Sequence, residues 1–323
     1  MEAMPCESHS LSVAILTIHS YIVLSFGGAS MGIGDEFARF KERYNIGKDL
    51  ISSISNRYQR ITGQLNKDFR KIDSKTANSF YVGSYGRDTA AKGISDLDIA
   101  YILPPAIYAN YNGYAHNGQS ALLQSVKHSI QNTYRTSESF GDGQVVVIKF
   151  TDGLTFEILP IFENQGGTWT YPNANNGGSW QTCNPRAEIA EIHTRNLATN
   201  RNLKYLCRMM RVWRDHNSVP MSGALIDTLA YQFIETWEHR DKSFHYHDYM
   251  ARDFLRYLAD QDKDKTYWRM PGSGSYVYKK DNFQDKARID YNIAVGACQL
   301  QNEEECAERR AKWSSVFGAT FPS

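Results

Sequence analysis

The segment VGSYGRDTAAKGISDLDIAYILP, residues 82–104, constrains the fold of this chain more than any other stretch. Its apolar end predicts a β-strand, and Asp96 and Asp98 stand two residues apart where that strand begins. Side chains two apart in a strand project from the same face. The sequence therefore predicts two carboxylates side by side on one face of a sheet.

A Gly-Ser turn lies about a dozen residues before these carboxylates. Glycine permits close approach of the backbone and unpaired N–H groups attract anions, so Gly83 and Ser84 can receive a polyphosphate. Taken alone, most DxD pairs are solvated turns or helix caps, and a Gly-Ser pair is weaker still. In this order, with a strand directly behind them, the two motifs predict a phosphate cradle beside a site for two Mg²⁺ ions.

Composition sets the class of protein. A chain of 323 residues with 41% hydrophobic and 22% charged residues is an ordinary globular protein of one large or two modest domains. The 36 basic and 35 acidic residues give a net charge of +1, which argues against a strongly basic nucleic-acid binder but leaves a local basic cleft open. No stable nucleic-acid partner is expected. The cysteines form no CxxC pair, which predicts reduced thiols and no zinc site; they are Cys6, Cys183, Cys207, Cys298 and Cys306.

The first thirty residues contain an apolar run, LSVAILTIHSYIVLSF, residues 11–26. His19 interrupts it, no Lys or Arg precedes it, and it is shorter than the roughly 20 residues that a membrane-spanning helix needs. Met31 then opens MGIGDEFARF, which is typical of a cytosolic N-terminus. We expect residues 1–30 to be a dispensable extension of a cytoplasmic protein without a membrane partner, with a membrane anchor as the alternative.

Between the extension and the end of the sheet, periodicity predicts several elements. Apolar residues at steps of three and four from about Asn45 to Ile72 predict one long amphipathic helix. A second helix is expected up to about residue 134, after a Tyr/Asn/Gly-rich stretch at 107–118. QVVVIKF, a Thr-Asp-Gly turn and LTFEILPIF predict a β-hairpin. The Gly-, Asn- and Pro-rich residues 164–183 predict a loop.

The rest of the chain is predicted to be helical. Asn184 and Pro185 supply a cap and a first-turn proline. RNLKYLCRMMRVWRDHN and SGALIDTLAYQFIETW each predict an amphipathic helix, the second starting at Ser222, and two further helices follow in the tail. A boundary near Cys183 divides the chain into a catalytic domain, residues 31–183, and a helical lobe, residues 184–323.

Residues in several of these segments resemble a known family. GS followed by DxD on the next strand is similar to the signature of the polymerase-beta-like nucleotidyltransferase superfamily. Within it, the chain resembles the CD-NTases with a SMODS-type catalytic domain, bacterial relatives of cyclic GMP-AMP synthase and oligoadenylate synthetase that act in antiphage (CBASS) signalling. The features span nearly the whole chain from Met31; they are GSYGRDTA to SDLDI, FEILPIF, MRVWRDHN followed by PMSGALIDTLA, and the ending AKWSSVFGATFP.

The resemblance implies an α+β fold, with a polymerase-beta-like core of mixed sheet and long N-terminal spine helix plus an α-helical C-terminal lobe that completes the nucleotide-binding cleft. Gly83 and Ser84 would hold the triphosphate, and Asp96, Asp98 and Glu157 would be the catalytic metal ligands. An acidic residue in a strand usually faces water, but the family places a third carboxylate, most often Asp, where this chain has Glu157 in FEILP. Glutamate reaches about 1.5 Å further and is a competent Mg²⁺ ligand.

The resemblance also assigns nucleotide-binding residues in the second half of the chain. Arg211 stands where a lysine usually meets the phosphates, and arginine binds phosphate in a forked geometry. Ser222 matches a serine that touches phosphate or sugar, whereas Gly223 stands where an aromatic often stacks on the base. Tyr85 is a candidate for that stacking. Arg87 either reaches phosphate or braces the loop.

The implied reaction joins nucleoside triphosphates, such as ATP and GTP, into a cyclic di- or trinucleotide with release of pyrophosphate. Two Mg²⁺ ions, or Mn²⁺ in their place, would activate the acceptor hydroxyl and hold the triphosphate, and Glu157 could take the hydroxyl proton. The product would act on an effector protein. The alternatives are an enzyme of the same fold acting on tRNA, protein or a small molecule, and a catalytically silent nucleotide-binding module, against which Asp96 and Asp98 argue.

Overall fold

The computed structural model describes residues 32–323, and a mixed sheet of seven strands lies at the centre of its first half. β2 (Asp96–Ile102) and β5 (Thr155–Glu163) are parallel neighbours, and the other pairs in the sheet are antiparallel. β6 and β7 continue from the end of β5. The remaining strands are β1 (Ser79–Tyr81), β3 (Glu138–Asp142), β4 (Val145–Lys149), β6 (Trp169–Asn173) and β7 (Ser179–Cys183).

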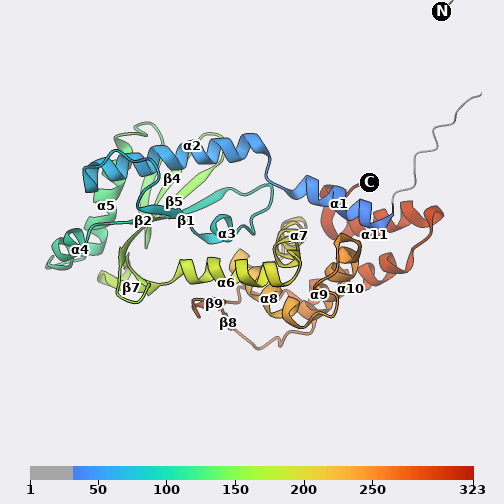
Figure 1. Cartoon of the computed structure of the whole chain (residues 1–323). Helices are drawn as coiled ribbons and strands as arrows, with labels where there is room; N and C mark the ends of the chain where they lie inside the picture. Colours follow the sequence, from blue (N-terminus) through green and yellow to red (C-terminus); the bar gives the residue numbers. More distant parts are fainter. Residues whose placement is uncertain (1–31) are drawn as a thin grey trace, which may run out of the picture. The chain divides into compact units, whose positions relative to one another are not determined.

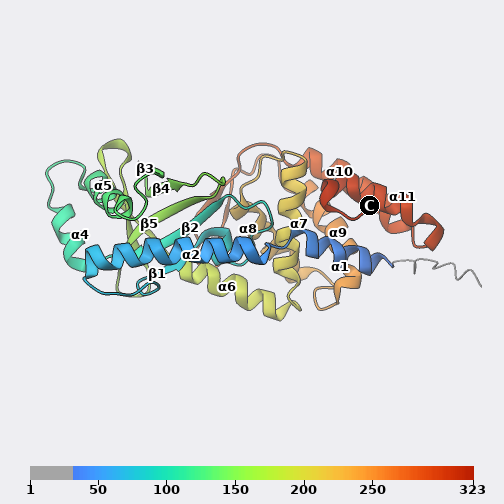
Figure 2. The ribbon, with the colours of Figure 1, turned by 90° about the horizontal axis from the view of Figure 1, so that it is seen from above.

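Two helices cover one face of this sheet (Figures 1 and 2). The predicted spine helix is α2 (Lys48–Leu65), which continues as a π-helical turn, Asn66–Arg70. Its apolar stripe packs with α5 (Gly118–Gln131) and with the inward side chains of β2, β4 and β5 in one buried cluster. This packing fixes the sheet from behind, so that the opposite face is free to form a site.

One prediction for this half of the chain is wrong. Residues 164–183 are not a loop, because β6 and β7 pair with each other and β6 also pairs with β5. Trp169 is buried under this hairpin, and the Trp180 ring lies 4.8 Å from Tyr108. Tyr108 belongs to α4 (Pro105–Asn112), a short helix within the stretch that the sequence marks only as rich in Tyr, Asn and Gly. The hairpin prediction for 144–162 is confirmed, since β4 and β5 are antiparallel neighbours.

The second half of the chain forms a helical lobe around one large buried cluster. The prediction that this half is entirely helical is wrong at one place, where β8 (Tyr267–Arg269) and β9 (Tyr276–Tyr278) form a separate hairpin. Each strand buries only its central residue, Trp268 or Val277, which is too short a pattern to recognise in the sequence. The helices are α6 (Pro185–Ala198), α7 (Asn202–His216), α8 (Gly223–Thr236), α9 (His247–Ala259), α10 (Gln284–Gln299) and α11 (Cys306–Phe317).

The first helix, α1 (Ile33–Tyr44), belongs by its packing to the helical lobe and not to the sheet. The Phe37 ring lies 5.1 Å from Trp313 and 5.3 Å from Phe321, so the start and the end of the described chain share one core. Residues 31–323 form one compact unit, and the boundary at Cys183 stays a prediction, although the sheet ends there and α6 begins at Pro185.

Within residues 32–323, no helix combines the length and the apolar character needed to cross a bilayer. The expectation for residues 1–30 lies outside the residues that the structure describes.

Candidate active site

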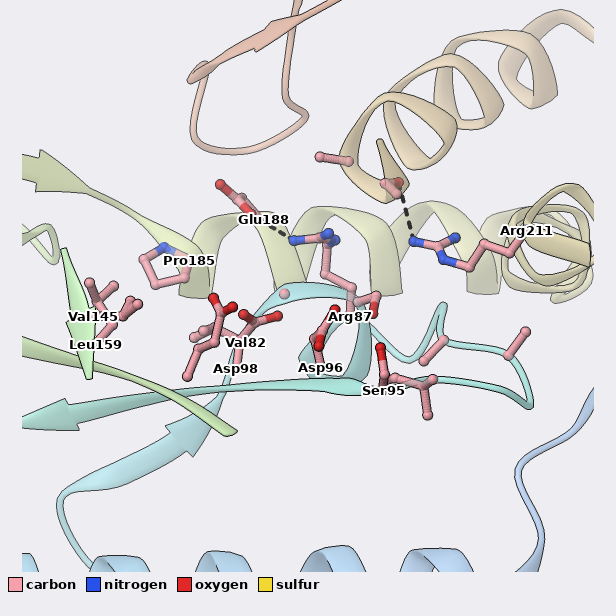
Figure 3. A pocket seen from close by; sticks show the side chains of 18 of the residues that line it. Val82, Arg87, Ser95, Asp96, Asp98, Val145, Leu159, Pro185, Glu188 and Arg211 are labelled. Atoms are coloured by element: carbon pink, nitrogen blue, oxygen red, sulfur yellow. Dashed lines mark hydrogen bonds and ion pairs between the residues drawn. The ribbon is translucent and has the colours of Figure 1, made fainter. Parts of the chain in front are cut away.

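A cavity of about 600 Å³ opens between the free face of the sheet and the helical lobe. Its floor carries the residues that the sequence singles out on β2 and β5, and its other walls come from the Gly-Ser turn and from α6, α7 and α8 (Figure 3). Seven of the predicted site residues line it together: Gly83, Ser84, Arg87, Asp96, Asp98, Glu157 and Arg211.

The three carboxylates meet because β2 and β5 run parallel in a fixed register. Asp98 is paired with Glu157 across the two strands, so their side chains leave the same face, and Asp96 follows two residues earlier on that face. Burial raises the pKa of Asp98 to about 6, an effect that Arg87 opposes and Asp96 increases. Burial, then the charges of Asp98 and Asp96, also raise the pKa of Glu157. The floor of the cavity thus concentrates negative charge that favours a bound cation.

The Gly-Ser turn is fitted to this floor. Gly83 opens the short helix α3 (Gly83–Gly86) with φ +59°, and a Cβ at this position would overlap the Asp98 carboxylate. The Val82 N–H donates to the Asp98 carbonyl at 2.9 Å, which ties the turn to β2. Only glycine satisfies both the backbone angle and the close approach. The turn therefore brings the N–H groups of its first residues beside the carboxylates.

Oxygen donors of this kind fit Mg²⁺, but the protein does not supply a complete cage. In the part of the chain that the structure describes, no three His, Cys, Asp or Glu side chains are arranged to hold a metal ion by themselves. Mg²⁺ is usually bound through one or two carboxylates plus substrate phosphates and waters. Asp96, Asp98 and Glu157 beside a phosphate-accepting turn match that mode of binding.

On the opposite wall, two arginines meet at one aspartate that the sequence analysis missed. Arg87 Nε donates to Asp227 Oδ2 at 3.0 Å, and Arg211 Nη1 donates to Asp227 Oδ1 at 2.7 Å. Arg87 also pairs with Glu188 at 3.0 Å. Arg87 thus both braces the loop and lines the cavity, so the two predicted roles are compatible. The signal available in the sequence was a lone charge, Asp227, inside the apolar helix SGALIDTLA.

Two predicted residues lie elsewhere. Ser222 caps α8, where its Oγ accepts the Leu225 N–H at 3.1 Å, and it lines an adjoining depression together with Arg214 and Lys280. Tyr85 does not line the cavity, because α3 turns its ring onto Tyr81, at 4.7 Å between ring centres. Tyr85 thus lies outside the cavity, and no aromatic side chain is among the described residues that line it.

The mixed sheet and the helical lobe together form a polymerase-beta-like fold. Residues 31–196, just over half of the 323, match the Second Messenger Oligonucleotide or Dinucleotide Synthetase domain, SMODS. The chain belongs to this family. It is a nucleotidyltransferase that synthesises a cyclic nucleotide second messenger. The predictions of α+β fold, family and enzyme class are confirmed.

Solved structures share the fold at low sequence identity. The chain superposes on Escherichia coli MS115-1 CdnC with ATP at a TM-score of 0.64 and 15% identity, covering 91% of this chain and 100% of that one. Vibrio cholerae DncV in its apo form superposes at a TM-score of 0.67 and 11% identity, covering 90% of this chain and 96% of that one. Bradyrhizobium diazoefficiens CdnG with GTP superposes at a TM-score of 0.62 and 11% identity, covering 88% of this chain and 94% of that one. No match was found among curated protein sequences.

Proposed function

We propose that this enzyme joins nucleoside triphosphates into a cyclic di- or trinucleotide, with release of pyrophosphate, at the cavity floored by Asp96, Asp98 and Glu157. One observation carries the proposal. The register of β2 against β5 brings Asp98 and Glu157 together, and Gly83 of the Gly-Ser turn packs directly against the Asp98 carboxylate. ATP and GTP are bound in the related CdnC and CdnG structures, which supports nucleoside triphosphates as the substrates.

In the proposed reaction, the N–H groups at Gly83 and Ser84 bind the triphosphate, and Arg211 neutralises its charge from the opposite wall. Asp96, Asp98 and Glu157 would hold two Mg²⁺ ions, for which Mn²⁺ would be a substitute. When bound, the metal supplies positive charge that acidifies the acceptor hydroxyl and stabilises the leaving pyrophosphate. Glu157 accepts the proton of that hydroxyl at its carboxylate. Holding both nucleotides in line provides most of the acceleration.

A linear dinucleotide that keeps its triphosphate is the first product, and a second transfer closes the ring. We infer that the cyclic nucleotide then binds an effector protein, and that the enzyme acts in cytoplasmic antiphage signalling. CdnC forms a complex with a HORMA protein, which shows that a structural relative of this chain has a protein partner. For this chain, the one protein partner that we propose is the effector that binds the cyclic nucleotide.

The test uses the purified full chain with Mg²⁺ and each pair of labelled nucleoside triphosphates, followed by phosphatase. A phosphatase-resistant oligonucleotide that disappears in Asp96→Ala/Asp98→Ala is the expected result. A product that persists in the double variant contradicts the assigned metal ligands. Labelled transfer to tRNA or protein in place of a free oligonucleotide contradicts the proposed reaction.

A matched glycine pair sharpens this test. Gly83→Ala places a methyl group against Asp98, whereas Gly93→Ala, also at the cavity and at φ +93°, meets nothing within 4 Å. Both variants carry the strain of a positive φ, so only their difference reports the fit between the turn and the carboxylate. We expect Gly83→Ala to lose about 100-fold or more in kcat/KM relative to Gly93→Ala, because displacing a metal ligand removes transition-state stabilisation.

A further inference from the structure

Asp227 is a fully buried carboxylate, 0% exposed, that holds groups from distant parts of the chain. Besides Arg87 and Arg211, it accepts a hydrogen bond from Thr89 Oγ1 at 2.8 Å. Arg87 and Thr89 follow the Gly-Ser turn, Arg211 lies on α7, and Asp227 lies on α8. One side chain therefore ties the loop that carries the phosphate cradle to two helices of the helical lobe.

We propose that Asp227 is a positioning residue that fixes Arg87 and Arg211 in the orientations in which they meet the nucleotide. This inference rests on the proposed function of the cavity. Asp227 itself is not among the residues that line the cavity, so it acts through the two arginines.

Bringing two cations together in a buried place costs free energy. Arg87 and Arg211 are 6% and 4% exposed, and like charges at short range repel strongly away from water. Burial by itself would raise the pKa of Asp227, but Arg211 and Arg87 outweigh burial and lower that pKa to about 2. Asp227 therefore stays ionised, and its two oxygens neutralise the two guanidinium groups separately.

The N–H donors that Arg87 and Arg211 do not use within the protein indicate the role of this cluster. A guanidinium has five N–H donors. Arg211 uses three of them, on Asp227, the Cys207 carbonyl and the Gly223 carbonyl. Arg87 uses two, on Asp227 and Glu188. Both side chains line the cavity, so each keeps donors for a phosphate while its plane is fixed by Asp227.

Loss of the Asp227 charge would also disturb the carboxylates on the cavity floor. Arg87 already acts electrostatically on Asp98. Without Asp227, the anions left to Arg87 are Glu188 and Asp98, and a guanidinium drawn to Asp98 competes with a cation there. We therefore expect Asp227→Asn to weaken the binding of both the nucleotide and Mg²⁺, and to leave the reacting groups in place.

A matched control lies on α10. Asp290 is also 0% exposed and pairs with Trp213 Nε1 at 2.7 Å and Lys286 Nζ at 2.8 Å, but it does not line the cavity. Both Asp→Asn variants remove a buried charge from a paired site, so both are expected to lower the unfolding temperature. A general loss of stability will therefore show equally in Asp227→Asn and Asp290→Asn.

The experiment measures kcat, the KM for nucleoside triphosphate and the Mg²⁺ concentration for half-maximal rate in the full chain. In Asp227→Asn, we expect the KM and the Mg²⁺ requirement to rise about tenfold or more, with kcat at saturation within about threefold of wild type. In Asp290→Asn, both constants should stay within about twofold. An unchanged KM in Asp227→Asn, or an equal rise in Asp290→Asn, overturns the proposal.

A second experiment does not require catalytic activity, so it tests the positioning role of Asp227 independently of the proposed function. Phenylglyoxal, which modifies guanidinium groups, is applied to wild type and both variants, and the modified arginines are identified by mass spectrometry. Arg87 and Arg211 should react clearly faster in Asp227→Asn than in Asp290→Asn. If wild type forms no product with any nucleotide, the proposed function fails and this comparison still decides the positioning role. Equal rates in the two variants contradict it.

Discussion

The Asp98 carboxylate is held where an ionised group destabilises the metal-free protein. Burial raises its pKa to about 6 from an ordinary value of 3.8, and the neighbouring Asp96 adds to the shift. Below pH 3.8, the carboxyl is protonated in both the folded and the unfolded chain. As the pH rises through 6, the folded protein loses a proton that it binds more tightly, so this contribution to stability is lost. A cation at the floor of the cavity would offset this loss.

Asp98→Asn removes the ionisation and should stabilise the metal-free protein above pH 6, by on the order of 2 kcal/mol. The gain should shrink towards zero near pH 4. Denaturant unfolding in EDTA across this pH range measures it, with Asp73→Asn, an exposed position, as the control. Equal stability of wild type and Asp98→Asn at pH 7.5 would show that the carboxylate is not strained by its surroundings.

At the scale of elements, the turn between β8 and β9 packs against the start of α6, which lines the active site. Gly272 has φ +82°, and a Cβ there would overlap the Ala187 carbonyl at the start of α6. The next residue, Ser273, donates to Glu188 at 2.8 Å, and Glu188 in turn holds Arg87. The hairpin therefore supports the arginine wall of the cavity from outside.

Gly272→Ala should lower the free energy of unfolding by at least about 1 kcal/mol more than Gly274→Ala does. Gly274 also has a positive φ, +68°, but a Cβ there meets nothing within 4 Å, so the difference isolates the contact with α6. Denaturant unfolding of both variants provides the comparison. If the two losses are the same, backbone strain alone explains them, and the turn does not support α6.

The elements that the sequence predicts best are those whose pattern repeats over several turns or is fixed locally. The stripe of α2 and the Gly-Ser turn with its Asp-x-Asp strand are of this kind. The strands β6, β7, β8 and β9 are not predicted by the sequence, because short strands depend on a partner that only the fold supplies. Asp227 was missed for the same reason, since 140 residues separate it from Arg87.

At the scale of the whole molecule, the chain passes through the helical lobe twice. α1 packs into that lobe, the chain then continues into α2, which covers the sheet, and the end of the chain returns to α1 (Figure 1). Arg43 on α1 donates to the Phe321 carbonyl at 3.2 Å, beside the cluster of Phe37, Trp313 and Phe321. The stability of the lobe therefore depends on residues that precede the catalytic sheet in the sequence.

Phe37→Ala tests this dependence. Phe37 is 1% exposed, and removing a buried phenyl ring of this kind costs about 3–5 kcal/mol through lost burial and the cavity left behind. Phe37 does not line the active-site cavity, so the KM for nucleotide should stay near the wild-type value at temperatures where the variant is folded. Thermal unfolding and steady-state kinetics measure the two effects, with Tyr278→Ala, 62% exposed, as the control aromatic. A variant that unfolds like wild type would mean that α1 is not an integral part of the lobe, whereas a raised KM with normal stability would mean that α1 acts on the site and not on the core.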